Sequence, residues 1–193
     1  GLVIHVLSGL SGLVLCLLLG RRRGYGRMPM LPHHLPMTVL GGAMLWFGWF
    51  GFNAGSALGA GTLAANAVLT TQMSAAIGIV GWVLVERYHR GKPTVLGAVS
   101  GGVSGLVAIT PAAGFVTPVA AIPIGFIGAI CCYVAVAILK SKFGYDDSLD
   151  AFGIHGVGGM WGAIATGLFA TVSVHPDGAD GFFYGGHFLI PKL

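Results

Sequence analysis

Two histidines occupy closely similar surroundings near opposite ends of the chain. His5 lies in IHVLSGLSG (4–12) and His155 in IHGVGGMWG (154–162), so both segments follow the pattern I-H-x-x-[S/G]-G-x-x-G. A neutral imidazole has one donor and one acceptor nitrogen, so two such rings can share an N–H···N hydrogen bond and still offer edges to a small polar solute. Burial in a dry place favours this neutral form. Three interpretations remain open: a proton relay along a pathway, ligation of a haem between two helices, and simple helix packing.

Glycines follow each histidine at the fourth and seventh positions. These glycines are Gly9 and Gly12 after the first histidine, and Gly159 and Gly162 after the second. At about 100° per residue, each glycine lies within roughly 40° of its histidine on a helix. Small residues let helix backbones approach closely in lipid. We therefore expect both histidines on close-packing helix faces, turned away from lipid.

The elements that carry these histidines are predicted to cross a membrane. The chain is 55% hydrophobic and only 8% charged, whereas an average soluble domain is about a quarter charged. Because a spanning helix needs about 20 apolar residues, the charge-free stretches predict six full transmembrane helices in a single domain, residues 1–193. Their approximate ranges are 1–20, 36–57, 62–87, 94–110, 119–140 and 150–171. The expected fold class is an all-α polytopic membrane protein.

Basic residues predict the orientation of these spans. Nine of the ten lysines and arginines fall in the loops after residues 20, 87 and 140, so the positive-inside rule places those loops in the cytoplasm. The net charge of +4 is then a topology signal and does not indicate nucleic-acid binding.

The two histidine-bearing spans run in opposite directions, yet each histidine comes early in its span. That arrangement is typical of inverted-topology repeats, which share a site near the bilayer midplane, although a chance match in glycine-rich sequence remains an alternative. Counting 1.5 Å per residue puts His5 about 24 Å from Arg21 but His155 only about 8 Å from Asp150. The two rings can therefore meet if the first span projects into the cytoplasm and the DDSLD segment (146–150) is tucked into the protein.

A second marked segment, LWFGWFGFNAGSA (45–57), concentrates aromatic side chains near the end of a span. Trp49, Phe52, Asn53 and Ser56 follow the i, i+3, i+4, i+7 spacing of one helical stripe. An aromatic belt at the membrane interface explains the rings. A cavity wall explains them equally well, because aromatic faces attract cations by about 0.5–2 kcal/mol.

The remaining polar residues receive structural interpretations. Asp150 is expected to cap the helix that carries His155, since an acid suits a helix N-terminus. Cysteines without metal-ligand spacing are expected to be apolar fillers, and the other histidines to be solvated loop residues. These residues are Cys16, Cys131 and Cys132, and His33, His34, His89, His175 and His187. The acids of the last loop, Asp177 and Asp180, have too common a spacing to predict a metal site.

Both marked segments resemble the most diagnostic stretches of the ammonium transporter family. The stretches are GWFGFNAGSA (48–57) and DDSLDAFGIHGVGGMWGAIATGLFA (146–170), with RGKPTVLGAVSGGVSGLVAITPAAGFV (90–116) between them. The resemblance covers essentially the whole chain, and it is closer to the microbial and plant members than to the Rhesus type. It implies an eleven-span fold of two inverted five-helix repeats plus a last helix, assembled as a homotrimer with one pore per subunit.

The chain starts without a methionine inside an apolar run and ends in GGHFLIPKL. We therefore expect it to be incomplete at both ends, and the resemblance implies spans five to ten with the start of an eleventh at 185–193. His5 and His155 would be the twin pore histidines, Phe52 a gate, and Trp49 a pore-lining ring. Ser56 would be the hydroxyl of an outer ammonium site, and Asp150 a structural acid that flanks the second histidine.

The resemblance implies a transporter in the plasma or inner membrane, without enzymatic activity, cofactor or metal. Ammonium would lose its proton before ammonia passes the pore, and metal ions would be excluded. The implied partners are ammonium or ammonia, the lipid bilayer and a cytoplasmic nitrogen-regulatory signal protein. Two alternatives stay open: a haem-binding electron carrier that uses both histidines, and an ammonium sensor with little transport.

Overall fold

The computed structural model describes residues 1–186, which are almost entirely helical. The helices are α1 (Leu2–Leu19), α2 (Leu35–Ala54), α3 (Thr62–Arg90), α4 (Val95–Ile109), α5 (Pro118–Tyr133), α6 (Lys140–Phe143) and α7 (Val157–Phe169). Two short 3-10 turns, η1 (Gly55–Ala57) and η4 (Phe182–Tyr184), and two π-helical segments, η2 (Val134–Leu139) and η3 (Phe152–Gly156), complete them. The predicted all-α class is confirmed. Most of the further span predicted at 185–193 lies outside the described residues.

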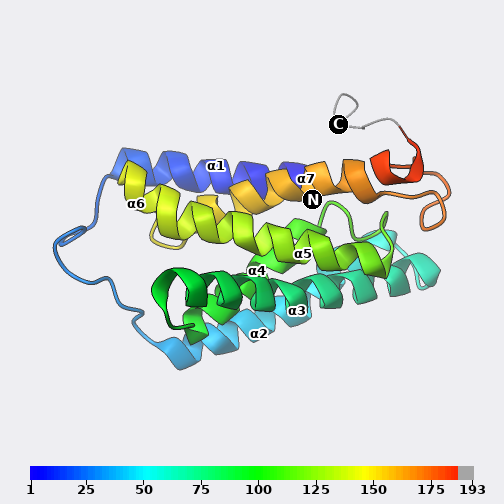
Figure 1. Cartoon of the computed structure of the whole chain (residues 1–193). Helices are drawn as coiled ribbons and strands as arrows, with labels where there is room; N and C mark the ends of the chain where they lie inside the picture. Colours follow the sequence, from blue (N-terminus) through cyan, green and yellow to red (C-terminus); the bar gives the residue numbers. More distant parts are fainter. Residues whose placement is uncertain (187–193) are drawn as a thin grey trace.

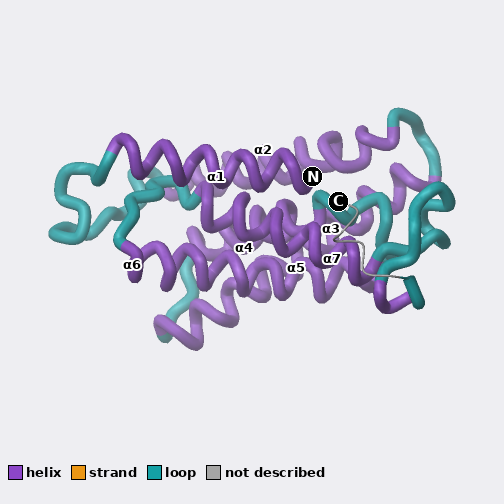
Figure 2. The backbone as a smooth tube through the Cα atoms, turned by 90° about the horizontal axis from the view of Figure 1, so that it is seen from above, coloured by secondary structure: helices purple, strands orange, loops and turns teal. Residues whose placement is uncertain are grey.

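The helices run roughly along one common direction, and the connecting loops gather at the two ends of the bundle (Figures 1 and 2). Four stretches are long and apolar enough to cross a membrane by length and composition: 2–19, 35–57, 62–90 and 118–143. The chain is thus a multi-pass membrane protein. Figure 1 also shows α1 lying beside α7, although they come from opposite ends of the chain.

Helix α4 is shorter than its predicted span of 94–110. Its 15 residues rise only about 22 Å at 1.5 Å per residue, less than the hydrocarbon thickness of about 30 Å. Most residues of α4 are buried. At the start of α4, the carboxylate of Glu86 accepts hydrogen bonds from the N–H and the hydroxyl of Thr94. Because α4 is surrounded by other helices, its ends can lie inside the protein.

Two long helices contain π-helical turns in their interior or at their start. Segment η2 continues α5 into α6, and η3 leads directly into α7. A π turn contains one residue more than an α turn, and such turns are frequent at functional sites. The turn in η3 contains His155.

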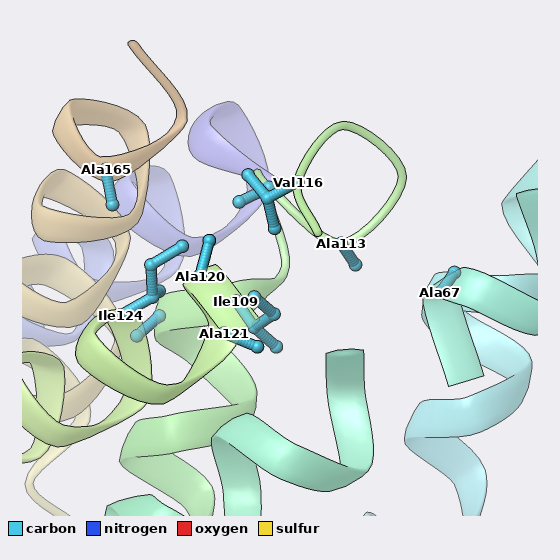
Figure 3. Packing of buried hydrophobic residues seen from close by; sticks show 10 residues of the cluster. Ala67, Ile109, Ala113, Val116, Ala120, Ala121, Ile124 and Ala165 are labelled. Atoms are coloured by element: carbon cyan, nitrogen blue, oxygen red, sulfur yellow. The ribbon is translucent and has the colours of Figure 1, made fainter. Parts of the chain in front are cut away.

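The buried core is built mainly from small side chains, as expected for helices that pack closely in lipid. Figure 3 shows the largest cluster, in which α3, α4, α5, α7 and the loop after α4 meet. Its members are Ala67, Ala108, Ile109, Ala112, Ala113, Val116, Ala120, Ala121, Ile124 and Ala165.

Helices α3, α4 and α5 cross most closely at Ser74. A methyl group at Gly105 would lie 2.2 Å from the carbonyl oxygen of Ser74, and one at Gly125 would lie 2.3 Å from the same atom. The Ser74 hydroxyl, which is fully buried, donates to the carbonyl of Gly105 at 2.8 Å. Both neighbouring helices therefore need glycine at this crossing.

Replacing Gly105 by valine should destabilise the purified protein, because the contacted atom belongs to backbone and cannot move aside alone. Overpacking of this kind costs about 1–3 kcal/mol or more. Thermal unfolding in detergent measures the effect. Gly51→Val in α2, where an added methyl group meets no atom within 4 Å, is the matched control and should melt close to the unaltered protein. Equal melting of both variants would contradict the proposed crossing.

Candidate functional site

The two histidines identified in the sequence meet in the structure. Nδ1 of His5 lies 3.1 Å from Nδ1 of His155, and the ring centroids are 5.3 Å apart with the planes inclined by 22°. His5 is only 4% exposed. Within residues 1–186 its Nε2 atom is buried and has no hydrogen-bond partner. The Nδ1 contact is therefore the hydrogen-bonding contact of the His5 ring in the described part of the chain.

This contact constrains the protonation of the pair. A neutral imidazole carries a proton on one nitrogen only, and an imidazolium carries protons on both. Two N–H groups cannot share one hydrogen bond, so at least one of the facing Nδ1 atoms of His5 and His155 carries no proton. The geometry therefore excludes two simultaneously charged rings.

Glycines bring α1 against η3 and α7 closely enough for the rings to touch. A methyl group at Gly9 would lie 2.2 Å from the backbone nitrogen of Gly156, and one at Gly159 would lie 2.8 Å from Cβ of His5. At Gly12 an added methyl group would lie 2.9 Å from Cβ of Ala151. Three of the four glycines singled out in the sequence therefore lie on the histidine-bearing contact.

The fourth glycine packs elsewhere. A methyl group at Gly162 would lie 2.4 Å from the carbonyl oxygen of Ala108. Gly162 therefore allows α4, and not α1, to pack closely against α7. The angular argument from sequence could not distinguish these neighbours, because two helices flank α7 on adjoining faces.

The aromatic stripe of α2 lies over His5. The indole of Trp49 stacks on the imidazole at 5.5 Å between centroids and 9° between planes, and Phe52 lies 6.0 Å from the same ring. Trp49 is 8% exposed, and its Nε1–H donates to the hydroxyl of Thr110 at 2.8 Å. That hydroxyl donates in turn to the carbonyl of Leu106. Trp49 therefore lines a cavity in a fixed orientation and is not a belt residue.

The two polar residues of the stripe, Asn53 and Ser56, have different surroundings. The amide of Asn53, which is 8% exposed, donates to the hydroxyl of Thr71 at 2.9 Å and so joins α2 to α3. The hydroxyl of Ser56 is exposed and donates to the carbonyl of Phe52 at 2.7 Å. Its two oxygen lone pairs remain able to accept from a solute.

Two cavities adjoin these residues. One of about 610 Å³ is lined by both histidines and by Trp49 and Phe52 among other residues. A second of about 350 Å³ is lined by Phe52, Asn53, Ser56 and neighbouring residues of the loops that follow α4 and α7. Phe52 lines both cavities and therefore stands between them.

The acid that caps the histidine-bearing helix is Asp147, and the prediction for Asp150 was wrong. The carboxylate of Asp147 accepts from the backbone N–H groups of Ala151 and Phe152 at 3.1 and 2.8 Å. Asp150 has a left-handed backbone conformation, with φ of 57°, and its side chain forms an ion pair with Lys140. Since the chain turns at Asp150, the donors of the first helical turn point back to Asp147. Sequence reasoning missed Asp147 because both acids precede the helix at plausible distances.

The first two residues of the DDSLD segment are tucked into the protein, whereas Ser148 and Leu149 are exposed. Asp146 and Asp147 are 6% and 4% exposed. The backbone N–H of Arg22 donates to the carboxylate of Asp146 at 2.7 Å, and its guanidinium donates at 2.6 Å. Arg22, in the loop after α1, thus holds the start of the DDSLD segment against the histidine-bearing helix pair.

Three of the remaining histidines are not simply solvated, and His187 lies outside the described residues. The ring of His175 stacks on Phe115 at 4.9 Å between centroids and lines the second cavity. His34 accepts from the N–H of Met37 and caps α2, and Nδ1 of His89 lies 2.8 Å from the hydroxyl of the buried Tyr133. The three cysteines are free thiols. The described part of the chain contains no group of three or more His, Cys, Asp or Glu side chains that could hold a metal ion.

Comparison with known proteins identifies the relatives of this chain. The sequence profile of the Ammonium Transporter Family matches residues 1–192. The chain belongs to the ammonium transporter family. It is 59% identical to an ammonium transporter of Bacillus subtilis over 192 residues, which is all of this chain and 47% of that protein. It is 46% identical to ammonium transporter Amt1 of Archaeoglobus fulgidus, over 98% of this chain and 48% of that one.

Solved structures of similar sequence have a similar arrangement of helices. The crystal structure of Saccharomyces cerevisiae Mep2 matches with a TM-score of 0.82 and 43% identity, over 88% of this chain and 38% of that one. A structure described as a sensor Amt protein matches with a TM-score of 0.84 and 32% identity, over 90% and 44%. The chain spans about half the length of the curated ammonium transporters it matches.

The histidine pair of this ammonium transporter chain does not fit a haem. Axial histidines bind iron from opposite faces of the macrocycle, so their ligating nitrogens are about 4 Å apart with the porphyrin between the rings. Here the two Nδ1 atoms are 3.1 Å apart in direct contact. There is no space between the rings for a macrocycle.

Replacing Asp146 by asparagine tests the contact that holds the DDSLD segment. Hydrogen bonds from Arg22 lower the pKa of the Asp146 carboxyl. The stabilisation is therefore present above the unfolded-state pKa of about 3.9 and is lost as the pH falls through the lower folded-state pKa. Because Arg22 is half exposed, we expect a loss of only about 1–2 kcal/mol.

Melting temperatures of the full-length protein at pH 7 and pH 3 check this expectation. Asp146→Asn should melt lower than the unaltered protein at pH 7, and the difference should shrink at pH 3. The exposed Asp177, changed to asparagine, is the control and should have no effect at either pH. A constant difference across this pH range would contradict the role of the charged carboxylate.

Proposed function

We propose that the full-length protein transports ammonium across the membrane through a hydrophobic pore lined by His5 and His155. The observation that carries the proposal is the Nδ1–Nδ1 contact of 3.1 Å between the two rings, beside a cavity that both line. Membership of the ammonium transporter family supports it. The relatives of this chain are named as transporters, which supports a transporter and not an enzyme.

The proposed outer site lies in the second cavity. Ser56 supplies oxygen lone pairs, and Phe52 supplies a ring that lines both cavities. A cation gains about 0.5–2 kcal/mol over an aromatic face, and more as the site is desolvated. Ammonium would therefore be collected beside Ser56 before it passes Phe52 toward His5.

Deprotonation accounts for both passage and selectivity in this proposal. An ion that enters an apolar pore loses its hydration at a cost of many kcal/mol, whereas a neutral molecule loses far less. Ammonium gives up its proton, and ammonia and the proton then move separately along or beside the histidine pair. His5 and His155, which both line the cavity, offer the passing molecule hydrogen-bonding groups. Metal ions such as K⁺ have no proton to lose and would be excluded.

The wider assembly is also proposed by analogy with the family. The chain would supply spans five to ten of two inverted five-helix repeats, in a homotrimer in the cell membrane. The loops after residues 20, 87 and 140 would face the cytoplasm, where a nitrogen-regulatory signal protein could bind. An ammonium sensor is a second candidate function, since one similar structure is described as a sensor Amt protein.

Removal of the histidine pair tests the proposed pathway. The full-length protein with both His5→Ala and His155→Ala should lose its preference for ammonium over K⁺, because the hydrogen-bonding groups of the lumen are gone. Ion-resolved uptake into proteoliposomes measures this preference. His33→Ala, in an exposed loop, is the control and should leave it unchanged. Wild-type selectivity in the double variant would rule the relay out.

The outer site is tested separately by Ser56→Ala. The hydroxyl is proposed to bind the cation before the pore, so its loss should raise the half-saturating ammonium concentration several-fold and leave the maximal uptake rate nearly unchanged. The size corresponds to the weaker end of hydrogen bonds to charged groups, about 1.5 kcal/mol or roughly tenfold. A fall in maximal rate at constant half-saturation would place Ser56 in the pore and not at its mouth.

A further inference from the structure

The two π-helical segments pack against each other beside the histidine pair. Segment η2 ends directly before Lys140, and η3 begins two residues after Asp150. A methyl group at Gly153 would lie 2.6 Å from Cγ2 of Val136, so the two segments are in close contact. The thiol of Cys132 donates to the carbonyl of Ile154 at 3.6 Å.

Lys140 joins the ends of these two segments. Its ammonium group forms an ion pair with Asp150 and donates to the backbone carbonyl of Asp147 at 3.2 Å. Asp147 in turn accepts from the first two N–H groups of the histidine-bearing helix. The side chains of Lys140 and Asp150 are only 23% and 27% exposed, so solvent screens the pair less than it screens a surface pair.

The backbone conformation of Asp150 also indicates that its surroundings hold this residue in place. Its φ of 57° places it in the left-handed region, where residues other than glycine are uncommon and persist only when their surroundings hold them. The ion pair with Lys140 is the contact that holds its side chain. Such backbone outliers gather at functional sites.

The register of η3 decides where the ring of His155 points. If residues 152–156 formed an ordinary α-helix, this turn would contain one residue fewer than the π turn does. The register would shift by one residue, and a side chain would rotate by about 100° around the helix axis. A change of this size would turn the His155 imidazole away from His5.

We propose that Lys140 is a positioning residue that acts on His155: by holding Asp150 and the carbonyl of Asp147, it fixes the start and register of η3 and thereby keeps the two imidazole rings in contact. Lys140 does not touch either ring, and it acts through the backbone that it holds. Its consequence for uptake rests on the proposed function, whereas its consequence for geometry does not.

The geometric test is a cryo-electron microscopy structure of the full-length protein with Lys140→Met, which keeps the length of the side chain and removes its charge. The expected result is that Nδ1 of His5 and Nδ1 of His155 move beyond hydrogen-bonding distance and that residues 152–156 lose the π turn. Lys140→Arg should restore both features. Lys142→Met is the matched control, because Lys142 is exposed and forms no ion pair within residues 1–186.

A second variant, Asp150→Asn, removes the same ion pair and keeps a residue type that tolerates the left-handed region. It should displace His155 as Lys140→Met does, and it serves if the lysine variant does not fold. An unchanged contact between the rings in either folded variant would overturn the proposal.

Ammonium uptake supplies a readout that a purely structural role would not move. Because the histidines lie beyond the outer site, Lys140→Met should lower the maximal uptake rate at an unchanged half-saturating concentration. The expected loss is up to about a hundredfold, as a misplacement of about 1 Å can cause. Displaced rings with unchanged uptake would support the positioning role and contradict the proposed function of the pair. An equal loss in Lys142→Met would overturn the role of Lys140.

Discussion

The hydrogen-bonding contact between His5 and His155 is the interaction on which the arrangement of the other residues depends. It joins side chains 150 residues apart in the sequence at 3.1 Å, and it needs two helices whose backbones almost touch. Gly9 and Gly159 permit that approach, since a methyl group at either position would overlap its neighbour. In lipid, where apolar burial does not draw helices together, such small residues and their dispersion contacts supply the packing.

The surroundings of the pair are fixed by hydrogen bonds from groups that do not line the cavity between the histidines and Trp49. Trp49 stacks on His5 and is oriented by Thr110, while Asp147 holds the start of the helix that carries His155. The cavity that both histidines line is otherwise mostly apolar, with Ser8 as a further polar residue in its wall. An apolar lumen with a few hydrogen-bonding atoms admits a small neutral solute at far lower cost than a bare cation.

Much of the fold could be predicted from the sequence, because its signals are strong. Runs without charge predict helices that cross a membrane, and the matched histidine and glycine patterns predict that α1 and α7 pack together at these faces. The orientation of Gly162 toward α4 could not be predicted, since an angular pattern on one helix does not say which neighbour it faces.

The least predictable part of the site was the start of the histidine-bearing helix. Counting residues assumed a regular helix from Asp150, whereas the chain turns at that residue, a π turn follows, and Asp147 caps the helix. This region has tertiary partners that are distant in sequence or unpredictable from local spacing: Asp150 pairs with Lys140, and the neighbouring Asp146 accepts from Arg22. Local propensity carries no information about them.

The two imidazoles share one hydrogen-bonding contact through a single proton and are not both charged. Nitrogen-15 NMR of the full-length protein in lipid, with labelled histidine, measures this directly through the coupling across an N–H···N bond. Near neutral pH, we expect one coupled pair of Nδ1 signals, of which one is protonated and the other is not. Two imidazolium spectra, or two Nε2-protonated rings without coupling, would contradict it.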